Sequence, residues 1–265
     1  MKTVTENLNR IIQAKSDIKN AIENKGVDVG DVTIDKYADK INQITSVDKP
    51  INVFSGLDLK EKELDLLGWE YPTGMKSLSG MFNGLPVSFI SVGRWQTDDC
   101  EDMSYMFSTT LYLEEIKGLD DLNTSNVVNM RGMFESAFMH GTWNLDLSTW
   151  DVSKVKNMSN QFAYDTKLMG LDISGWDMSS VENANGMFSN CWELETLRFG
   201  GGLKVSTDFD GCDNLSVDSL LSVINGVANV RNVEQKPVLR FGAINLAKLT
   251  SEEKAIAINK GWSLE

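Results

Sequence analysis

Cysteine and histidine are scarce in this 265-residue chain, and their scarcity excludes several kinds of site. Three cysteines provide no disulfide framework, and a single histidine cannot supply a metal-ligand cluster. No C-x-x-C pair is present, so no metal site is predicted. The chain also lacks a G-x-S-x-G sequence, a phosphate-binding loop and the paired-carboxylate pattern of a glycan hydrolase. We therefore predict a non-enzymatic protein that has no cofactor.

Long apolar runs and an excess of basic residues are also missing. No stretch approaches the roughly 18 apolar residues that span a bilayer, so we predict no membrane insertion. The first residues lack a continuous apolar run, so no cleavable secretion signal is expected. The formal net charge is -13, and because charges balance in residues 1–50, the whole excess lies in residues 51–265. Such an acidic body would repel nucleic acid and suits a neutral or cationic partner such as a glycan.

What the chain does contain is an internal repeat. A phenylalanine closes each unit, at spacings of 25, 27, 28 and 26 residues and then a shorter one: Phe82, Phe107, Phe134, Phe162, Phe188 and Phe209. Before each of the first five, apolar residues recur at intervals of three and four after a helix-capping residue type, as in Val127, Met130 and Met133 after Ser125. Further upstream, alternations such as residues 145–147 indicate a short strand. Each unit is therefore predicted to be strand, turn, short helix and loop, and such a period is typical of a solenoid.

The clearest copies, residues 145–162 and 171–188, carry the sequence pattern L-x-[LI]-S-x-W-D-x-S. They resemble the BspA-like leucine-rich-repeat surface-protein family. The resemblance implies an α/β fold, a right-handed leucine-rich-repeat solenoid with a strand and a short helix in each unit, and a role in adhesion or recognition. We assign this solenoid to residues 51–215, between an N-terminal helical attachment or oligomerisation segment (1–50) and a C-terminal helix–strand cap (216–265).

The N-terminal segment is predicted to contain helices over residues 3–24 and 34–44, followed by a linker at 45–50. Apolar residues of the first helix fall on heptad positions: Val4, Leu8, Ile11, Ile18 and Ile22. Two interpretations stay open, an amphipathic helix packed on its own domain and a self-associating coiled coil, for which a trimer is favoured. Residues 15–27 and 37–41 also resemble an N-terminal module of bacteriophage tail and fibre proteins. That resemblance implies attachment to other virion proteins.

Differences between the units point to a candidate binding surface. The loop from Phe134 to Leu145 is longer than its successor and rich in aromatic residues, and equivalent loops carry further rings. Rigid rings on a regular scaffold are typical of recognition surfaces. The candidate binding residues are Tyr112, Phe138, His140, Trp143 and Trp192. The alternative is that these rings only cover the open side of the repeat, and a second candidate face comprises Lys117, Asp146, Asp172 and Arg198.

Other conspicuous residues are better explained by structure. Trp150 and Trp176 occupy a position that Leu122 takes in another unit, so we interpret them as packing residues. Asp151 and Asp177 follow these tryptophans and are predicted to cap turns. A buried thiol is predicted for Cys100. Cys191 and Cys212 are expected on adjacent units, about 5 Å apart, where a disulfide is within reach but free thiols are favoured.

After residue 215 the pattern changes to a helix over 216–226, a strand over 238–241, a helix over 250–260 and a last strand over 261–264. Thr250 and Glu253 form a predicted capping box. Taken together, these features predict a recognition protein of a phage tail or fibre that binds a host-surface protein or glycan. The alternative is a BspA-like adhesin on the bacterial cell surface.

Overall fold

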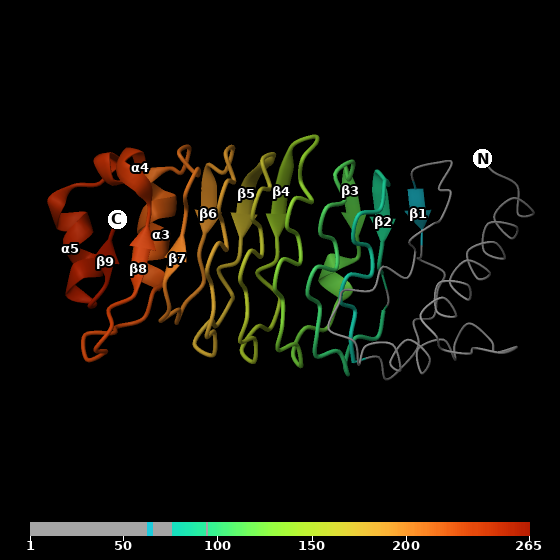
Figure 1. Ribbon diagram of the computed structural model, residues 1–265, viewed down its shortest axis with the longest axis horizontal. Helices are drawn as coiled ribbons and strands as arrows, with labels where there is room; N and C mark the ends of the chain where they lie inside the picture. Colours follow the sequence, from blue (N-terminus) through green and yellow to red (C-terminus); the bar gives the residue numbers. More distant parts are fainter. Residues whose placement is uncertain (1–62, 66–75, 94) are drawn as a thin grey trace, which may run out of the picture.

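The computed structural model describes the backbone of residues 63–65, and residues 76–93 and 95–265 (Figure 1). The predicted helices over 3–24 and 34–44, the self-associating segment and the linker at 45–50 lie outside these residues. In the described part, short strands form three separate parallel sheets, ordered β1-β2-β3, β4-β5-β6 and β7-β8-β9. The strands are β1 (Glu63–Asp65), β2 (Phe89–Ser91), β3 (Glu115–Lys117), β4 (Trp143–Asp146), β5 (Leu168–Asp172), β6 (Thr196–Arg198), β7 (Thr207–Asp208), β8 (Val238–Arg240) and β9 (Ser263–Leu264).

The predicted leucine-rich-repeat solenoid, with a strand and a short helix in each unit, is wrong. Within the described residues the three α-helices all follow residue 216: α3 (Val217–Gly226), α4 (Gly242–Lys248) and α5 (Ser251–Asn259). Figure 1 shows these helices gathered at the C-terminal end, whereas strands β2 to β6 follow one another along the rest of the described chain, with turns and loops between them. A short 3-10 helix, η2 (Leu119–Asp121), lies between β3 and β4. The strands also stop in three sheets and do not continue as one ladder.

The segments that were expected to be helical form overlapping turns. In the unit closed by Phe134, the backbone N–H groups of Met133 and Glu135 donate to carbonyls three residues earlier. The N–H groups that alternate with them donate instead to the next unit, that of Gly132 to the Ser159 carbonyl and that of Phe134 to the Gln161 carbonyl. This alternation removes the consecutive i to i−4 hydrogen bonds that define an α-helix.

Left-handed residues explain why the turns prevail. The residue two before the closing Phe has positive φ in five units, as at Gly132 (φ 56), and so does the residue two after it in all six, as at Ser136 (φ 58). Such residues interrupt a right-handed helix on both sides of the Phe. The apolar spacing of three and four residues fits these turns as well as it fits a helix, and Val127, Met130 and Met133 are all buried.

The closing phenylalanines form one column, as their spacing predicts. Ring centroids of neighbours lie 5.3 Å apart for Phe82 and Phe107, 5.4 Å for Phe107 and Phe134, and 5.6 Å for Phe134 and Phe162. The column continues through Phe188 and Phe209 and ends on Phe241 of the C-terminal region. All seven rings are buried, so the column is the centre of the apolar core.

The C-terminal elements agree closely with their sequence signals. Ser216 caps α3 by accepting the Ser219 N–H, and Thr250 and Glu253 form the predicted capping box at α5. Strand β8 and strand β9 lie within the predicted ranges. Helix α4 was not predicted as a separate element.

Candidate functional site

Two aromatic rings from adjacent units stack at the surface. Tyr112 and His140 lie in the loops that precede β3 and β4, and their ring planes are 8° from parallel with centroids 5.6 Å apart. Tyr112 is 51% exposed, and His140 is also exposed. The structure thus brings together two of the five predicted binding residues as a flat platform facing solvent.

Phe138 and Trp143, in contrast, belong to the core. Phe138 is fully buried and Trp143 nearly so, with ring centroids 4.5 Å apart. The Trp143 indole N–H donates to the His140 carbonyl over 2.9 Å. Because their rings are enclosed, we correct their predicted role from contact with a ligand to support of the loop that carries His140.

Trp192 is exposed at a separate place, three units from Tyr112. Its side chain is 58% exposed, its indole N–H donates to Asn190 Oδ1 over 3.4 Å, and its carbonyl accepts from Asn214 Nδ2 over 2.8 Å. A Cβ added at Gly211 would lie 3.3 Å from the indole Cδ1, so this glycine lets the ring pack against the backbone. Lys167, in the preceding unit, forms an ion pair with Glu193, the residue that follows Trp192.

Sequence reasoning missed Tyr164. Its side chain is 49% exposed, and its φ of 64° is the left-handed conformation that the residue two after the closing Phe has in all six units. Other units place Gly84, Ser136 or Asn190 at this position, so a tyrosine there was the available signal. We define the aromatic loop edge as Tyr112, His140, Tyr164 and Trp192.

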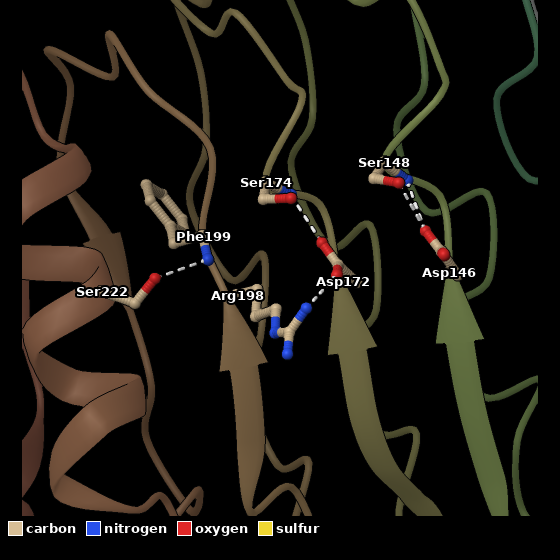
Figure 2. Close-up of polar contacts among 7 residues, drawn as sticks. All are labelled: Asp146, Ser148, Asp172, Ser174, Arg198, Phe199 and Ser222. Carbon is tan, nitrogen blue, oxygen red and sulfur yellow. Dashed lines mark hydrogen bonds and ion pairs between the residues drawn. The ribbon is translucent and has the colours of Figure 1, made fainter.

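The second predicted face lies at the carboxyl ends of β4, β5 and β6 (Figure 2). Asp146 Oδ1 accepts from both the backbone N–H and the hydroxyl of Ser148, over 2.9 and 2.7 Å. Asp172 accepts from the Ser174 N–H over 3.0 Å and from Arg198 over 3.3 Å. The Ser148 hydrogen bonds hold the pKa of Asp146 below its ordinary value. Both carboxylates therefore have local partners.

Figure 2 also shows how this face meets α3. The Phe199 backbone N–H, just beyond β6, donates to the Ser222 hydroxyl of α3 over 2.8 Å. The side chain of Lys117, the fourth residue predicted for this face, lies 5.2 Å from the Phe89 ring centroid and 3.4 Å from Glu115. Each charged group on the face is thus already engaged by a neighbour.

The carboxylates that follow the tryptophans cap turns, as predicted. Asp151 accepts the Ser153 N–H and Asp177 the Ser179 N–H, each over 3.0 Å, and these serine hydrogen bonds lower the pKa of both groups. Trp176 is buried and donates its indole N–H to the Leu147 carbonyl over 2.7 Å, which confirms its packing role. Trp150 does the same to Leu119 over 2.9 Å.

One unit carries buried polar groups that its neighbours lack. Asp165 is fully buried, and its Oδ1 accepts from the N–H groups of Ala137 (2.8 Å) and Phe138 (3.0 Å), while Oδ2 has no partner among the described residues. Burial raises the pKa of Asp165 well above its ordinary value. Gln161 is also fully buried, and neither amide atom has a partner in the described part of the chain.

The cysteines are free thiols and all three are buried. Cys191 donates to the Phe162 carbonyl over 3.0 Å, and Cys212 donates to the Phe188 carbonyl over 2.9 Å. Burial raises the pKa of Cys100 to about 12. Among residues 76–93 and 95–265, no group of three or more His, Cys, Asp or Glu side chains is arranged to hold a metal ion.

Comparison with known proteins gives one match. Residues 73–197, less than half of the chain, match a family described as "Mycoplasma protein of unknown function, DUF285". No curated protein and no solved structure matches the chain. None of the helices in the described part has the length and hydrophobicity that crossing a bilayer requires.

Proposed function

We propose that this chain is a non-enzymatic recognition protein that binds a host-surface glycan or protein through the aromatic loop edge. The observation that carries the proposal is the solvent exposure of large rings held on a hydrogen-bonded framework. Tyr112, Tyr164 and Trp192 are each about half exposed, although rings of this size are usually enclosed. Exposed Tyr and Trp rings bury a large area on contact at little conformational cost, so they are favoured in binding surfaces.

The geometry favours an extended ligand. The closing Phe rings between the units that carry Tyr112 and Trp192 step by 5.4, 5.6 and 5.9 Å, so these two side chains are separated by roughly 17 Å along the stack of units. The apolar face of a sugar ring can pack on the indole of Trp192, where Asn190 and Asn214 provide nearby polar groups. A second residue of an oligosaccharide, or of a peptide, would then reach the Tyr112–His140 platform.

We further propose that the protein belongs to a phage virion, as a tail or fibre component. This placement rests on the resemblance of residues 15–27 and 37–41 to tail proteins, which also supports attachment of residues 1–50 to other virion proteins. Mass spectrometry of purified particles tests it, and absence of the chain from intact virions would refute it. Release of the chain from intact bacteria by surface proteolysis would favour the alternative, a bacterial cell-surface adhesin.

The binding site is tested by single substitutions in a glycan array and a host-cell binding assay. We expect Trp192→Ala and Tyr112→Ala each to weaken binding by about tenfold or more, since such anchors typically contribute over 1 kcal/mol. Ile258→Ala is the matched control, because Ile258 on α5 is also 58% exposed but lies far along the chain in the C-terminal region. Equal binding by all three variants and the native protein would reject the aromatic loop edge as the site.

A further inference from the structure

A row of exposed side chains runs across five units, in the segment that precedes each closing Phe. Each member lies six residues before its closing Phe, and the backbone N–H of each donates to the carbonyl of the member before it, over 2.8 Å at every step. The row is therefore in register from unit to unit. Its members are Lys76, Glu101, Val128, Lys156 and Glu182, all exposed, and we name them the charge row.

When the order of the charge row is reversed, every charged position meets a charge of the opposite sign. Read forward it is plus, minus, neutral, plus, minus, and read backward it is minus, plus, neutral, minus, plus. If a second copy is turned by 180° about an axis through Val128, in the plane of contact and perpendicular to the row, the two rows face each other antiparallel. Lys76 then faces the second copy's Glu182, and Glu101 faces its Lys156. Val128, which is 36% exposed, meets its own equivalent on the axis.

A neighbouring row also pairs opposite charges when its order is reversed. Two residues earlier in three of the units lie Asp99, Asn126 and Lys154, all exposed. The same rotation places Asp99 opposite the second copy's Lys154 and Asn126 opposite itself. Lys154 Nζ donates to Asn126 Oδ1 over 2.6 Å within one chain, so the central position of this row is already ordered.

We propose that the charge row is a self-association surface on which a second copy of this chain docks antiparallel. A twofold contact uses one patch on both copies, so the patch must complement itself, and these rows do. The two rows together carry three basic and three acidic side chains, whereas the whole chain has a net charge of -13. Because these two rows carry no net charge, two copies meet there with less repulsion than between other parts of their acidic surfaces.

Within each chain, ion pairs hold the charges in place. Lys76 lies 2.7 Å from Glu101, and Lys156 lies 3.1 Å from Glu182. Docking would surround each of these charges with opposite charges along its own row and across the contact. Isolated surface pairs contribute little, but an alternating network of this kind fixes the register between partners.

The test is cross-linking of the full-length chain. Val128→Cys places identical thiols on the axis, and a short bis-maleimide should join two copies there, because the three native cysteines are buried. Tyr164→Cys, on the aromatic loop edge, is the control and should give only background cross-linking. If Val128→Cys is joined no faster than Tyr164→Cys, the proposal is wrong.

Reversing the charge of Glu101 or Lys156 then tests which residues of the two copies face each other. In the Val128→Cys background, Glu101→Lys alone or Lys156→Glu alone turns two attractive contacts into repulsive ones, so cross-linking should fall about tenfold or more. In an equal mixture of the two variants, the lysine introduced in one copy faces the glutamate introduced in the other. The unchanged Lys156 of the first copy then faces the unchanged Glu101 of the second, so cross-linking between unlike copies should return. Any loss of ion pairs within a chain affects like and unlike pairs equally and cannot imitate this pattern.

Parallel association through residues 1–50 would bring Glu101 near Glu101 of another copy, and mixing would then give no selective recovery. That result, or cross-linking that ignores the charge reversals, would overturn the antiparallel contact. The ligand-binding assays of the aromatic loop edge use other residues, so either proposal can fail without the other.

Discussion

Gln161 offers a prediction that the repeat itself defines. It stands one residue before its closing Phe, where four other units have Met81, Met106, Met133 and Met187. Its side chain is fully buried, and no described residue pairs with its amide nitrogen or oxygen. Gln161→Met restores the residue of the other units at nearly constant side-chain volume, so we expect it to stabilise the protein.

The size of the gain follows from the burial. Burying an amide without a hydrogen-bond partner costs about 1–3 kcal/mol, and a buried thioether chain adds favourable apolar contact. We therefore expect the free energy of unfolding to rise by about 1–3 kcal/mol, which is a large share of the 5–15 kcal/mol typical of a domain.

Urea unfolding followed by tryptophan fluorescence measures this change, since Trp150 and Trp176 lie in the same core. The midpoint should rise while the slope stays constant, because the surface exposed on unfolding is unchanged. Met133→Gln is the reciprocal control at the equivalent position of the preceding unit, and it should destabilise by a similar or larger amount.

A lower midpoint for Gln161→Met, combined with a destabilised Met133→Gln, would refute the reasoning. That outcome would mean that the Gln161 amide has a favourable polar environment in solution that its methionine counterparts do not need. A gain for Gln161→Met with no loss for Met133→Gln would instead show that the two positions are not equivalent.

Three further substitutions test other parts of the repeat. Asp165→Asn should raise stability at neutral pH, because burial raises the pKa of Asp165 above 3.8. For the native protein, the free energy of unfolding should fall by up to about 1.4 kcal/mol per pH unit as the pH rises above that value. Melting temperatures measured from pH 4 to 7 should show this fall for the native protein and not for Asp165→Asn. Phe134→Ala should cost about 3–5 kcal/mol in urea unfolding, since the ring stacks on both neighbours in the column. Gly186→Ala should lower the melting temperature, because its φ is 69° and a Cβ would lie 2.3 Å from Asn160 Oδ1, and Asn160→Gly in the same chain should recover part of the loss.

The apolar positions of the repeat could be predicted without the structure, but their conformation could not. Spacings of three and four residues identify which side chains of the unit closed by Phe134 are buried. The same spacing suits an amphipathic helix and a series of tight turns, so it does not choose between them. The choice depends on backbone hydrogen bonds from Gly132 and Phe134 to the next unit, which a single unit read alone does not reveal.

For the candidate site, too, the sequence identified some of the residues but not the direction of their side chains. Tyr112, His140 and Trp192 were recognised as loop aromatics, and they are exposed. Phe138 and Trp143 come from the same loops but turn inward, because loop composition does not specify the direction of a side chain. Tyr164 was passed over, because the left-handed turn at its repeat position became visible only in the structure.

Sequence alone determined the period of the repeat, the stacking of its closing phenylalanines and the capped helices α3 and α5. These features depend on local residue types or on regular spacing, so a linear reading contains them. Only the tertiary structure decided that the units are built of turns, that the strands break into three sheets, and that charges 25 to 106 residues apart share one surface row. Those outcomes depend on hydrogen bonds between units, which form only when the neighbouring unit is in place.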